Sequence, residues 1–416
     1  MNTKIHICLL TSARVFERAY GGEERFTILL ANWLAAHEKE VTLMGSTFAG
    51  IKTEHISNYD LGNRNKKKEK AGNKKTRTLN LPHFVFFLSR LVISFLWIFK
   101  ILLINKKYPM TLIHAQDTGY SGLAAIIAGR ILKIPVVITS HGIRHKTLET
   151  SIQGRLKKIL LNFEYRLDLF SISHADGLIV VNRSIGDYFK EIAVLKRGAE
   201  IIPIPINIKN FEFSGAKRDT MRNELGIGEK TKVIGFVGRF SPEKNLLTLL
   251  ISFANVARDD SSIKLMLVGT GPEEPKLKEF VSRNDIEDRV IFCGVRYDIN
   301  MLLSAFDIFV LPSYVEGFST ALLEAMASGR PIICSNIAAN RELVTHNKEA
   351  LMVNPHNVNE LNHAIQILIK DDSLGISLGT NARNKATHYD EHEILPKVTQ
   401  YYKLILAQRN ERTYEN

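Results

Sequence analysis

The chain of 416 residues lacks several patterns that mark common classes of enzyme. It has no Asp-x-Asp pair, so a metal-chelating acidic pair of that form is excluded. No Gly-x-Gly-x-x-Gly follows the first predicted strand, residues 5–10, which argues against a dinucleotide dehydrogenase. No signal peptide is expected, because residues 1–10 lead directly into that strand. The three cysteines lack Cys-x-x-Cys spacing, so we expect reduced core residues of a cytosolic protein at Cys8, Cys293 and Cys334.

Length and the alternation of elements predict an α/β protein of two domains. A chain of this size exceeds one ordinary core. Strand-like runs alternate with helical stretches in both halves, which is typical of parallel sheets with helical crossovers. Because Pro203 and Pro205 interrupt any helix near the middle, we expect domains of residues 1–205 and 206–390, with a C-terminal helix, 391–416, packed on the first. The predicted strands are 5–10, 41–44, 112–114, 136–139, 177–181, 233–237, 264–268, 290–292, 308–311 and 332–334.

Two glutamates, Glu316 and Glu324, stand eight residues apart around an expected helix start. Ser319 and Thr320 are suitable N-cap residues, and the apolar run after them has a helical composition. Glu316 would precede the helix and Glu324 would lie about one turn inside it, with free N–H groups and the positive end of the helix dipole between them. This arrangement suits a ligand with a central anion and hydroxyls at both ends, such as a nucleotide-diphosphate sugar. The simpler alternative is a solvated turn followed by a surface glutamate.

A second pattern lies at the end of the predicted strand 233–237. Gly238 and Arg239 follow this strand directly, and Pro242 then occupies the first position of a helix. Arg239 and Lys244 therefore flank a strand-to-helix turn, where two cations can neutralise a diphosphate leaving group. The alternative is that both are ordinary surface charges.

These patterns resemble the retaining glycosyltransferase family 4, the group 1 glycosyltransferases of polysaccharide and glycolipid synthesis. The similarity covers roughly residues 200–345, and the chain departs from the family at 203–207, where Pro-Asn-Gly and an acidic residue are usual. The resemblance implies the GT-B fold, in which two Rossmann-like, doubly wound domains face a central cleft. The matching elements are the E-x7-E pair, the phosphate-binding turn with Gly238, Arg239, Lys244 and Asn245, and the segments 267–272, 309–313 and 325–331.

The amino half resembles the family more loosely. Gly21 and Gly22 match its Gly-Gly-x-Glu-Arg helix start, where glycine lets the backbone approach donor phosphates or the acceptor; an ordinary glycine turn is the alternative. His114 and His141 lie at or just beyond the carboxyl ends of predicted strands, where ligands of open α/β sheets collect. By resemblance His141 is the family's histidine near the sugar. We rank His114 below it, because a satisfied core histidine explains it equally well.

The resemblance also implies the chemistry. It predicts a hexosyltransferase-type enzyme that moves a sugar, with retention, from a nucleotide-diphosphate donor, by default a UDP-sugar, to a lipid-linked or polysaccharide acceptor in cell-surface glycan synthesis. No carboxylate stands out as a nucleophile, so we favour front-face displacement, in which the departing diphosphate receives the acceptor's proton. No cofactor is expected, and the reaction should be independent of metal, since the Asp-x-Asp pair of the other large glycosyltransferase fold is absent.

Roles for individual residues follow from the same resemblance. Arg239 and Lys244 would stabilise the leaving group, Glu316 would hold the sugar hydroxyls, and Glu324 the ribose. His141 would reach the sugar from the other domain, and domain closure would exclude water. The predicted catalytic residues are His141, Arg239, Lys244 and Glu316, and the predicted donor-binding residues are Gly21, Gly22, Gly238, Arg239, Lys244, Glu316, Gly317, Phe318, Ser319, Thr320, Ala321, Leu322 and Glu324.

The net charge of +12 is unevenly distributed. Segment 64–77 carries eight Lys or Arg against one acidic residue, and segment 84–104 after it is almost entirely apolar, with Arg90 and Lys100 embedded. We interpret these as a basic loop beside an interfacial amphipathic helix, which binds anionic lipid at roughly 1 kcal/mol per basic residue. This predicts a cytoplasmic enzyme peripherally associated with the membrane. A core helix beside a solvated charge run is one alternative; a transmembrane anchor is another, but it would bury two cations.

Two other functions remain open from the sequence. One is a non-hydrolysing nucleotide-sugar epimerase of the same fold, which also holds a diphosphate between two domains. The other is a basic protein that binds membrane or nucleic acid, with salt-sensitive affinity and no sugar turnover. The motifs in the carboxyl half favour the transferase, with a nucleotide sugar, a glycan or lipid-linked acceptor and an anionic membrane as partners, and no nucleic acid.

Overall fold

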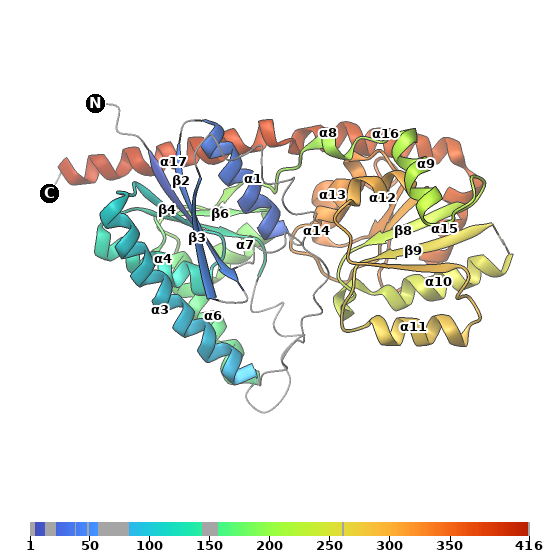
Figure 1. Cartoon of the computed structure of the whole chain (residues 1–416), viewed down its shortest axis with the longest axis horizontal. Helices are drawn as coiled ribbons and strands as arrows, with labels where there is room; N and C mark the ends of the chain where they lie inside the picture. Colours follow the sequence, from blue (N-terminus) through green and yellow to red (C-terminus); the bar gives the residue numbers. More distant parts are fainter. Residues whose placement is uncertain are drawn as a thin grey trace. The chain divides into compact units, whose positions relative to one another are not determined.

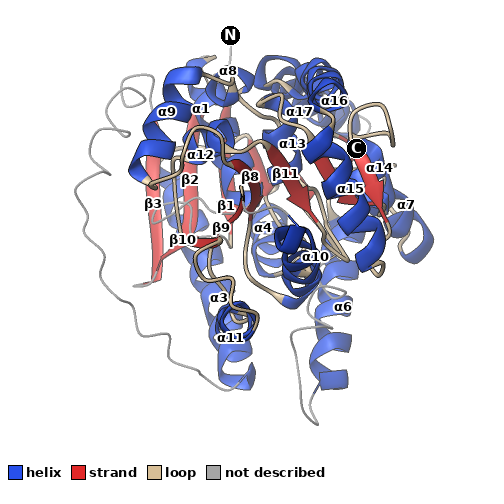
Figure 2. Ribbon diagram, turned by 90° about the vertical axis from the view of Figure 1, so that its right-hand side faces the viewer, coloured by secondary structure: helices blue, strands red, loops and turns tan. Residues whose placement is uncertain are grey.

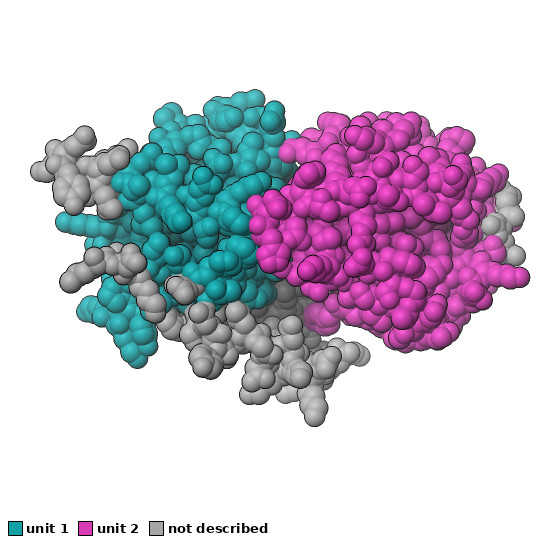
Figure 3. Space-filling model, turned by 90° about the horizontal axis from the view of Figure 1, so that it is seen from above, with its two compact units in different colours: residues 1–204, 394–416 teal, residues 205–393 magenta. Residues whose placement is uncertain are grey.

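The computed structural model describes residues 5–12, 22–37, 39–47, 50–56, 83–143, 157–259 and 262–414, and Figure 1 shows their elements. The chain divides into two compact units (Figure 3). Unit 1 contains residues 1–204 and 394–416, and unit 2 contains residues 205–393. The basic segment 64–77 and Gly21 lie outside the described residues.

Unit 1 is built on a seven-stranded sheet in the order β3-β2-β1-β4-β5-β6-β7. Neighbouring strands are parallel, except that β2 and β3 are antiparallel. The order reverses at β1, which pairs with both β2 and β4, and this is the switch point of a doubly wound sheet. The strands are β1 His6–Thr11, β2 Glu40–Thr47, β3 Gly50–Ile56, β4 Leu112–Ala115, β5 Val136–Ser140, β6 Gly177–Val180 and β7 Glu200–Ile201.

Helices cover both faces of this sheet, and Figures 1 and 2 show α3, α4 and α6 on one face with α1 and α17 on the other. The central strands are buried as a result, and β1, β4, β5 and β6 are continuous runs of buried residues. The helices are α1 Gly22–Ala36, α3 His83–Lys107, α4 Tyr120–Leu132, α6 Lys157–His174, α7 Arg183–Ile192 and, from residue 394 on, α17 Glu391–Tyr414.

Unit 2 contains a six-stranded, fully parallel sheet in the order β10-β9-β8-β11-β12-β13, with its switch point between β8 and β11. Its strands are β8 Lys232–Val237, β9 Ile263–Val268, β10 Val290–Gly294, β11 Ile308–Leu311, β12 Ile332–Ser335 and β13 Leu351–Val353. Its helices are α8 Ile208–Phe211, α9 Gly215–Glu224, η1 Pro242–Lys244, α10 Leu246–Asp259, α11 Glu274–Arg283, α12 Ile299–Ala305, α13 Thr320–Ala327, α14 Ala338–Leu343, α15 Val358–Lys370, α16 Asp372–Ala386 and η2 Thr387–Tyr389.

All the strands predicted from the sequence exist, with ends shifted by a few residues at most. The sequence missed β3, β7 and β13. All three are edge strands, and β7 is only two residues long, so none has the long apolar run by which most of the others were recognised. The expected α/β architecture with two doubly wound sheets is confirmed.

The three cysteines are free thiols, as expected, but they are not equally buried. Cys8 and Cys334 are fully buried, and burial raises the pKa of each thiol to about 12. Cys293 lies on the edge strand β10 and is only partly buried, so the expectation of a core position is wrong for this residue.

The apolar segment 84–104 forms most of α3, which packs against α4 along one side. Trp97 and Ile101 are buried there, and Ser94 donates a hydrogen bond to the carbonyl oxygen of Tyr120 at 3.2 Å. The Arg90 guanidinium lies over the Tyr120 ring. Ser94 and Arg90 are therefore turned toward the protein, because the hydroxyl and the guanidinium find partners on α4.

The opposite side of α3 is apolar and exposed. We call it the α3 apolar surface, and its members are 48–66% exposed: Val92, Phe95, Leu96, Phe99 and Leu103. Val92, Phe95, Phe99 and Leu103 follow one another at intervals of three or four residues, and Leu96 is adjacent to Phe95, so the five lie along one face of the helix. Within the described part of the chain, no helix combines the length and apolarity needed to cross a membrane.

Candidate active site

The loops after β8 and β11 leave neighbouring strands at the switch point of unit 2. In open α/β sheets, ligands bind outside the carboxyl ends of the strands at this point. The first loop carries Gly238 and Arg239, and the second carries Glu316. The two motifs predicted from the sequence, about 75 residues apart, therefore meet at one edge of the sheet.

Lys244 and Glu316 form an ion pair across these two loops. The Lys244 Nζ atom lies 2.7 and 2.8 Å from the two carboxylate oxygens of Glu316, and the Ser313 hydroxyl donates to Oε1 of Glu316 at 2.7 Å. The two side chains are only 19% and 9% exposed, so each charge compensates the other in a partly desolvated place. The sequence suggested separate ligands for these residues and did not predict that they contact each other.

Asn245 fixes the turn that carries Lys244. It follows η1 in the left-handed conformation, with φ of 56°, which asparagine tolerates better than most residues. Its Nδ2 group donates to the carbonyl oxygens of Pro312 and Pro355, at 3.1 and 2.8 Å. Asn245 therefore ties the Lys244 turn to the loop after β11, a role that its place in the motif did not reveal.

Two glycines after β9 let the Arg239 turn pack closely on the neighbouring loop. Gly269 has φ of 137°, and a Cβ atom there would lie 1.9 Å from the Gly238 carbonyl oxygen. A Cβ atom on Gly271 would lie 2.2 Å from the carbonyl oxygen of Phe240. Any larger residue would displace the backbone that positions Arg239, whose guanidinium makes no ion pair with the residues that the structure describes.

The helix α13 begins at Thr320, after an N-cap residue whose own side chain makes no capping hydrogen bond. Ser319 occupies the N-cap position, but its hydroxyl donates to Oδ1 of Asn340 at 2.6 Å instead of accepting from the first turn. Ser319 is therefore the N-cap residue, as predicted, although its side chain makes no capping hydrogen bond. The backbone of the first turn is left for another acceptor.

The other predicted donor-binding residues around α13 differ in exposure. Gly317, Phe318, Thr320 and Ala321 are partly exposed. Leu322 is fully buried, so only its backbone can meet a ligand. Glu324 lies inside α13 as predicted and is 3% exposed.

In unit 1, His114 is a core residue. Its Nε2 atom lies 2.7 Å from the Thr139 hydroxyl and its Nδ1 atom bonds the hydroxyl of Tyr402 on α17. Burial lowers the pKa of His114 to about 3, so the ring is neutral. The structure therefore favours the core-histidine interpretation.

His141 follows β5 and is partly exposed. Its Nε2 atom lies 3.3 Å from the Gln116 amide oxygen, and its ring meets the edge of Phe26. Desolvation lowers the pKa of His141 to about 3, although the nearby Asp117 acts in the opposite direction. The Nδ1 atom is buried and has no hydrogen-bond partner among the described residues. The neutral ring can therefore exchange hydrogen bonds with an uncharged ligand.

Gly22 begins α1 at the carboxyl end of β1. The Thr11 hydroxyl at the end of β1 donates to Glu23 at 2.5 Å, which holds the start of this helix against the strand. Gly22 thus lies at the switch point of unit 1. Gly21, its predicted partner, is outside the described residues.

Comparison with known proteins decides the family. The model of group 1 glycosyl transferases matches residues 217–385, and that of glycosyltransferase family 4 matches residues 20–210. The chain belongs to the group 1 glycosyltransferases. The two models together match both halves of this glycosyltransferase, including the amino half, whose motifs resemble the family only loosely.

Its relatives include bacterial transferases with named acceptors. It is 27% identical over 345 residues to the N,N'-diacetylbacillosaminyl-diphospho-undecaprenol alpha-1,3-N-acetylgalactosaminyltransferase of Campylobacter jejuni, covering 80% of this chain and 88% of that one. It is 29% identical to the UDP-Gal:alpha-D-GlcNAc-diphosphoundecaprenol alpha-1,3-galactosyltransferase of Escherichia coli, covering 68% and 72%. A third relative, the alpha-monoglucosyldiacylglycerol synthase of Streptococcus pneumoniae, is 31% identical, but the match spans 56% of this chain and 54% of that protein.

Solved structures share the fold over nearly the whole chain. Sucrose-phosphate synthase of Thermosynechococcus elongatus superposes with a TM-score of 0.78 at 20% identity, covering 97% of this chain and all of that one. Anabaena HepE in complex with UDP-glucose gives 0.73 at 21% identity, with 96% and 99% covered. The GT-B fold is confirmed, as is the enzyme class, a glycosyltransferase of the hexosyltransferase type. The family match thereby favours glycosyl transfer over the epimerase and the binding protein.

Proposed function

We propose that this glycosyltransferase moves a sugar, with retention, from a UDP-sugar to a lipid-linked or polysaccharide acceptor beside an anionic membrane. The observation that carries the proposal is the Lys244–Glu316 pair, which lies with Arg239 at the switch point of unit 2. Two relatives are named for alpha-1,3 transfer to diphosphoundecaprenol-linked sugars, and one of these uses UDP-Gal. These names support the proposed donor and acceptor classes.

In the proposed reaction, negative charge develops on the diphosphate leaving group. As the bond from the anomeric carbon to the diphosphate oxygen breaks, both bonding electrons stay on that oxygen. Arg239 and Lys244 stabilise the growing charge, together with the uncapped backbone N–H groups of α13. The acceptor hydroxyl attacks from the same face, and its proton passes to the departing phosphate oxygen.

Glu316 has two compatible roles in this scheme. An ammonium group has three N–H donors, so Lys244 can keep its bond to Glu316 while it binds a phosphate oxygen. The Glu316 carboxylate thereby orients Lys244, and its remaining lone pairs accept bonds from the sugar hydroxyls. We assign Glu324 to the ribose, and His141 to a neutral contact with the donor sugar.

One screen tests the reaction. The purified protein is incubated with a panel of nucleotide sugars and an undecaprenyl-diphosphate sugar analogue, and the product linkage is assigned by NMR. We expect turnover with a UDP-sugar and a product that keeps the donor's anomeric configuration. An inverted linkage would contradict the retaining mechanism. Conversion of the donor into a different nucleotide sugar without an acceptor would favour the epimerase alternative.

Membrane association is proposed from the α3 apolar surface together with the basic sequence that precedes α3. Five large apolar side chains face solvent along one helix, with Lys106 and Lys107 exposed at its end. Apolar side chains that enter the lipid interface gain transfer free energy, while basic residues are attracted by anionic headgroups.

Vesicle sedimentation tests this part separately. We expect the double variant Phe95→Ser/Phe99→Ser to bind anionic vesicles at least tenfold more weakly, because each aromatic side chain that moves from water into the lipid contributes about 1.5–3 kcal/mol. Both residues are at least 60% exposed, so the variant should stay folded. Ile376→Ser in α16, at 69% exposure, is the matched control. Equal binding by the double variant and the control would refute the α3 apolar surface as the docking element.

A further inference from the structure

Gln116 is a fully buried glutamine at the carboxyl edge of the unit 1 sheet. It directly follows β4, and its backbone N–H donates to the Leu10 carbonyl oxygen on β1 at 2.8 Å. His141 directly follows β5, which pairs with β4 in parallel, so both residues leave the same edge of the sheet. The Oε1 atom of Gln116 lies 3.3 Å from the Nε2 atom of His141. Gln116 therefore contacts the residue that we assign to the donor sugar.

The other contacts of Gln116 set the orientation of its amide. Its Nε2 group lies 3.2 and 3.3 Å from the two ring nitrogens of His114. Those nitrogens are already bonded to the hydroxyls of Tyr402 and Thr139. An amide N–H group carries partial positive charge and is attracted to the electrons of a neutral ring, whereas a carbonyl oxygen in the same place would be repelled. The carbonyl oxygen of Gln116 is therefore the atom turned to His141.

This carbonyl oxygen selects one tautomer of His141. Because the oxygen can only accept, the Nε2 atom of His141 must carry the hydrogen, and Nδ1 then holds the lone pair. Desolvation lowers the pKa of His141 to about 3 and outweighs the opposite effect of Asp117, so the ring has a single hydrogen to place. His141 is therefore a hydrogen-bond acceptor at Nδ1.

The Nδ1 atom of His141 supplies an independent observation. It is buried and has no hydrogen-bond partner among the residues that the structure describes, although buried polar atoms are nearly always bonded. The ring packs in a T-shaped arrangement on Phe26, an apolar neighbour that offers no hydrogen bond. A lone pair in this state is satisfied by a ligand with an O–H or N–H group to donate. A sugar hydroxyl is such a group, whereas an ionised phosphate oxygen is not.

We propose that Gln116 is a positioning residue that fixes His141 as an acceptor, so that Nδ1 receives a hydrogen bond from a hydroxyl of the transferred sugar. The neutral contact assigned to His141 thereby gains a direction, with the ligand donating. The sugar contact rests on the proposed function. The tautomer does not, because it is set by contacts within unit 1.

Nitrogen NMR on the full chain, with isotopically labelled histidine and no ligand, tests the tautomer. The two nitrogens of a neutral imidazole differ widely in chemical shift according to which one carries the hydrogen, and His141→Asn identifies the signals of His141. We expect Nε2 to carry the hydrogen in the parent. Gln116→Met, an unbranched side chain of similar length without the carbonyl oxygen, should lose this preference. A parent with the hydrogen on Nδ1, or a folded Gln116→Met with the parent's shifts, would overturn the proposal.

Donor analogues test the sugar contact. In each analogue of the accepted UDP-sugar, one sugar hydroxyl is replaced by fluorine, which cannot donate a hydrogen bond. We expect one analogue to lower kcat/KM about tenfold in the parent, the value of one hydrogen bond, and to cause no such loss in Gln116→Met. With the unmodified donor, Gln116→Met should lower kcat/KM about tenfold, while its affinity for UDP, which lacks the transferred sugar, changes by no more than about twofold.

Thr139→Val is the matched control, because it removes a hydrogen bond to His114 in the same buried network and leaves the contact between Gln116 and His141 in place. It should keep the parent's tautomer and the parent's response to the analogues. If Gln116→Met responds to every analogue as the parent does, the sugar contact is refuted. If no nucleotide sugar is turned over, the proposed function fails and the sugar contact with it, whereas NMR still decides the role of Gln116.

Discussion

The two units have the same order of parallel strands around their switch points, but different chemistry at the carboxyl edges. In unit 2 the edge carries charge, with Lys244 paired to Glu316 beside Arg239. In unit 1 it carries two neutral histidines, whose pKa values are both lowered to about 3. The nearby Asp117 carboxylate is engaged by backbone N–H groups of Ser12 and Gly119.

This difference shows what the fold supplies and what the residues decide. The doubly wound sheet brings loops from neighbouring strands together in both units. In unit 2 the loops hold a lysine and an arginine, which suits a ligand that gains negative charge. In unit 1 a buried, neutral hydrogen-bonding network suits recognition of hydroxyl groups. The following predictions test this division between a charged and a neutral edge.

The largest effect is expected at the charged edge. Lys244→Ala and Arg239→Ala should each lower turnover about 10²–10³-fold, the cost of removing one preorganised electrostatic contact. Lys232→Ala is the control. Lys232 is the first residue of β8, the strand that precedes Arg239 and Lys244, but it pairs with Asp372 on the surface. Steady-state kinetics of folded variants measures the effect. Near-normal turnover in Lys244→Ala or Arg239→Ala would remove the charged edge from the mechanism.

The neutral edge should appear in the pH dependence of stability. Between about pH 6.5 and pH 3 the unfolded chain protonates His141 while the folded chain does not, so the free energy of unfolding falls as the pH falls. The slope is about 1.4 kcal/mol per pH unit for each such histidine. His141→Asn should remove one such contribution in urea denaturation between about pH 5 and about pH 6.5.

The difference in slope between the parent and His141→Asn cancels the carboxylates that titrate in the same range. A His141→Asn slope equal to that of the parent would mean that His141 is charged in the folded protein.

A smaller effect separates the two glutamates. Glu324→Ala should weaken both UDP and the UDP-sugar about tenfold, the value of one hydrogen-bonded contact to ribose hydroxyls. Glu316→Ala should not weaken free UDP, because it leaves the Lys244 cation available to the diphosphate, but it should weaken the UDP-sugar. Calorimetry with both ligands measures this. Equal losses of UDP affinity in the two variants would contradict the assigned roles.

The smallest expected effect is that of metal removal. If Arg239 and Lys244 neutralise the diphosphate, turnover should be unchanged in excess EDTA. Complete loss of turnover that magnesium or manganese restores would mean that a metal ion carries this charge instead.

The spacing of residues in the sequence was sufficient to predict most strands and to place the motif residues before or inside α13. Buried apolar runs located ten strands, and the eight-residue spacing placed Glu316 before α13 and Glu324 inside it. Such features depend on local periodicity and helix-start signals, which are written in consecutive residues. The edge strands β3 and β13 lacked such runs and were missed.

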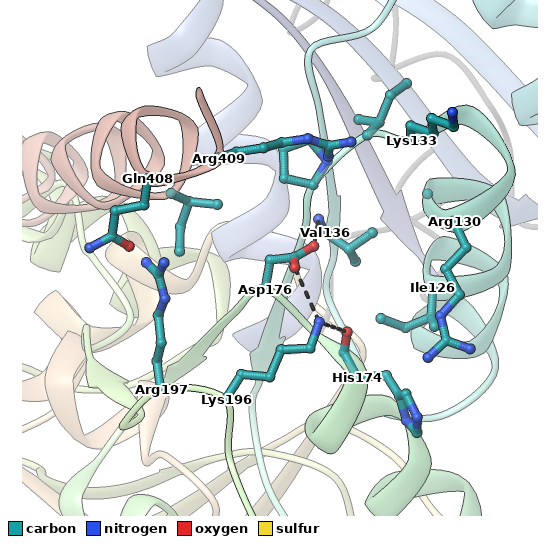
Figure 4. Close-up of a pocket in the computed structure, with 14 residues that line it drawn as sticks. Ile126, Arg130, Lys133, Val136, His174, Asp176, Lys196, Arg197, Gln408 and Arg409 are labelled. Atoms are coloured by element: carbon teal, nitrogen blue, oxygen red, sulfur yellow. Dashed lines mark hydrogen bonds and ion pairs between the residues drawn. The ribbon is translucent and has the colours of Figure 1, made fainter. Parts of the chain in front are cut away.

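Contacts between distant residues were decided only by the tertiary structure. Lys244 and Glu316 are 72 positions apart, and their pairing depends on the register of β8 beside β11. Ser94 faces inward because α4 offers it the Tyr120 carbonyl oxygen, a contact with a residue 26 positions away in the chain. A pocket in unit 1 is lined by residues from Ile126 to Arg409 (Figure 4), and no local pattern specifies such a meeting. The sequence by itself determined all but three of the strands and the chemical groups that they carry, whereas packing decided which of those groups meet, since partners far apart in the chain are selected by how the elements fit together.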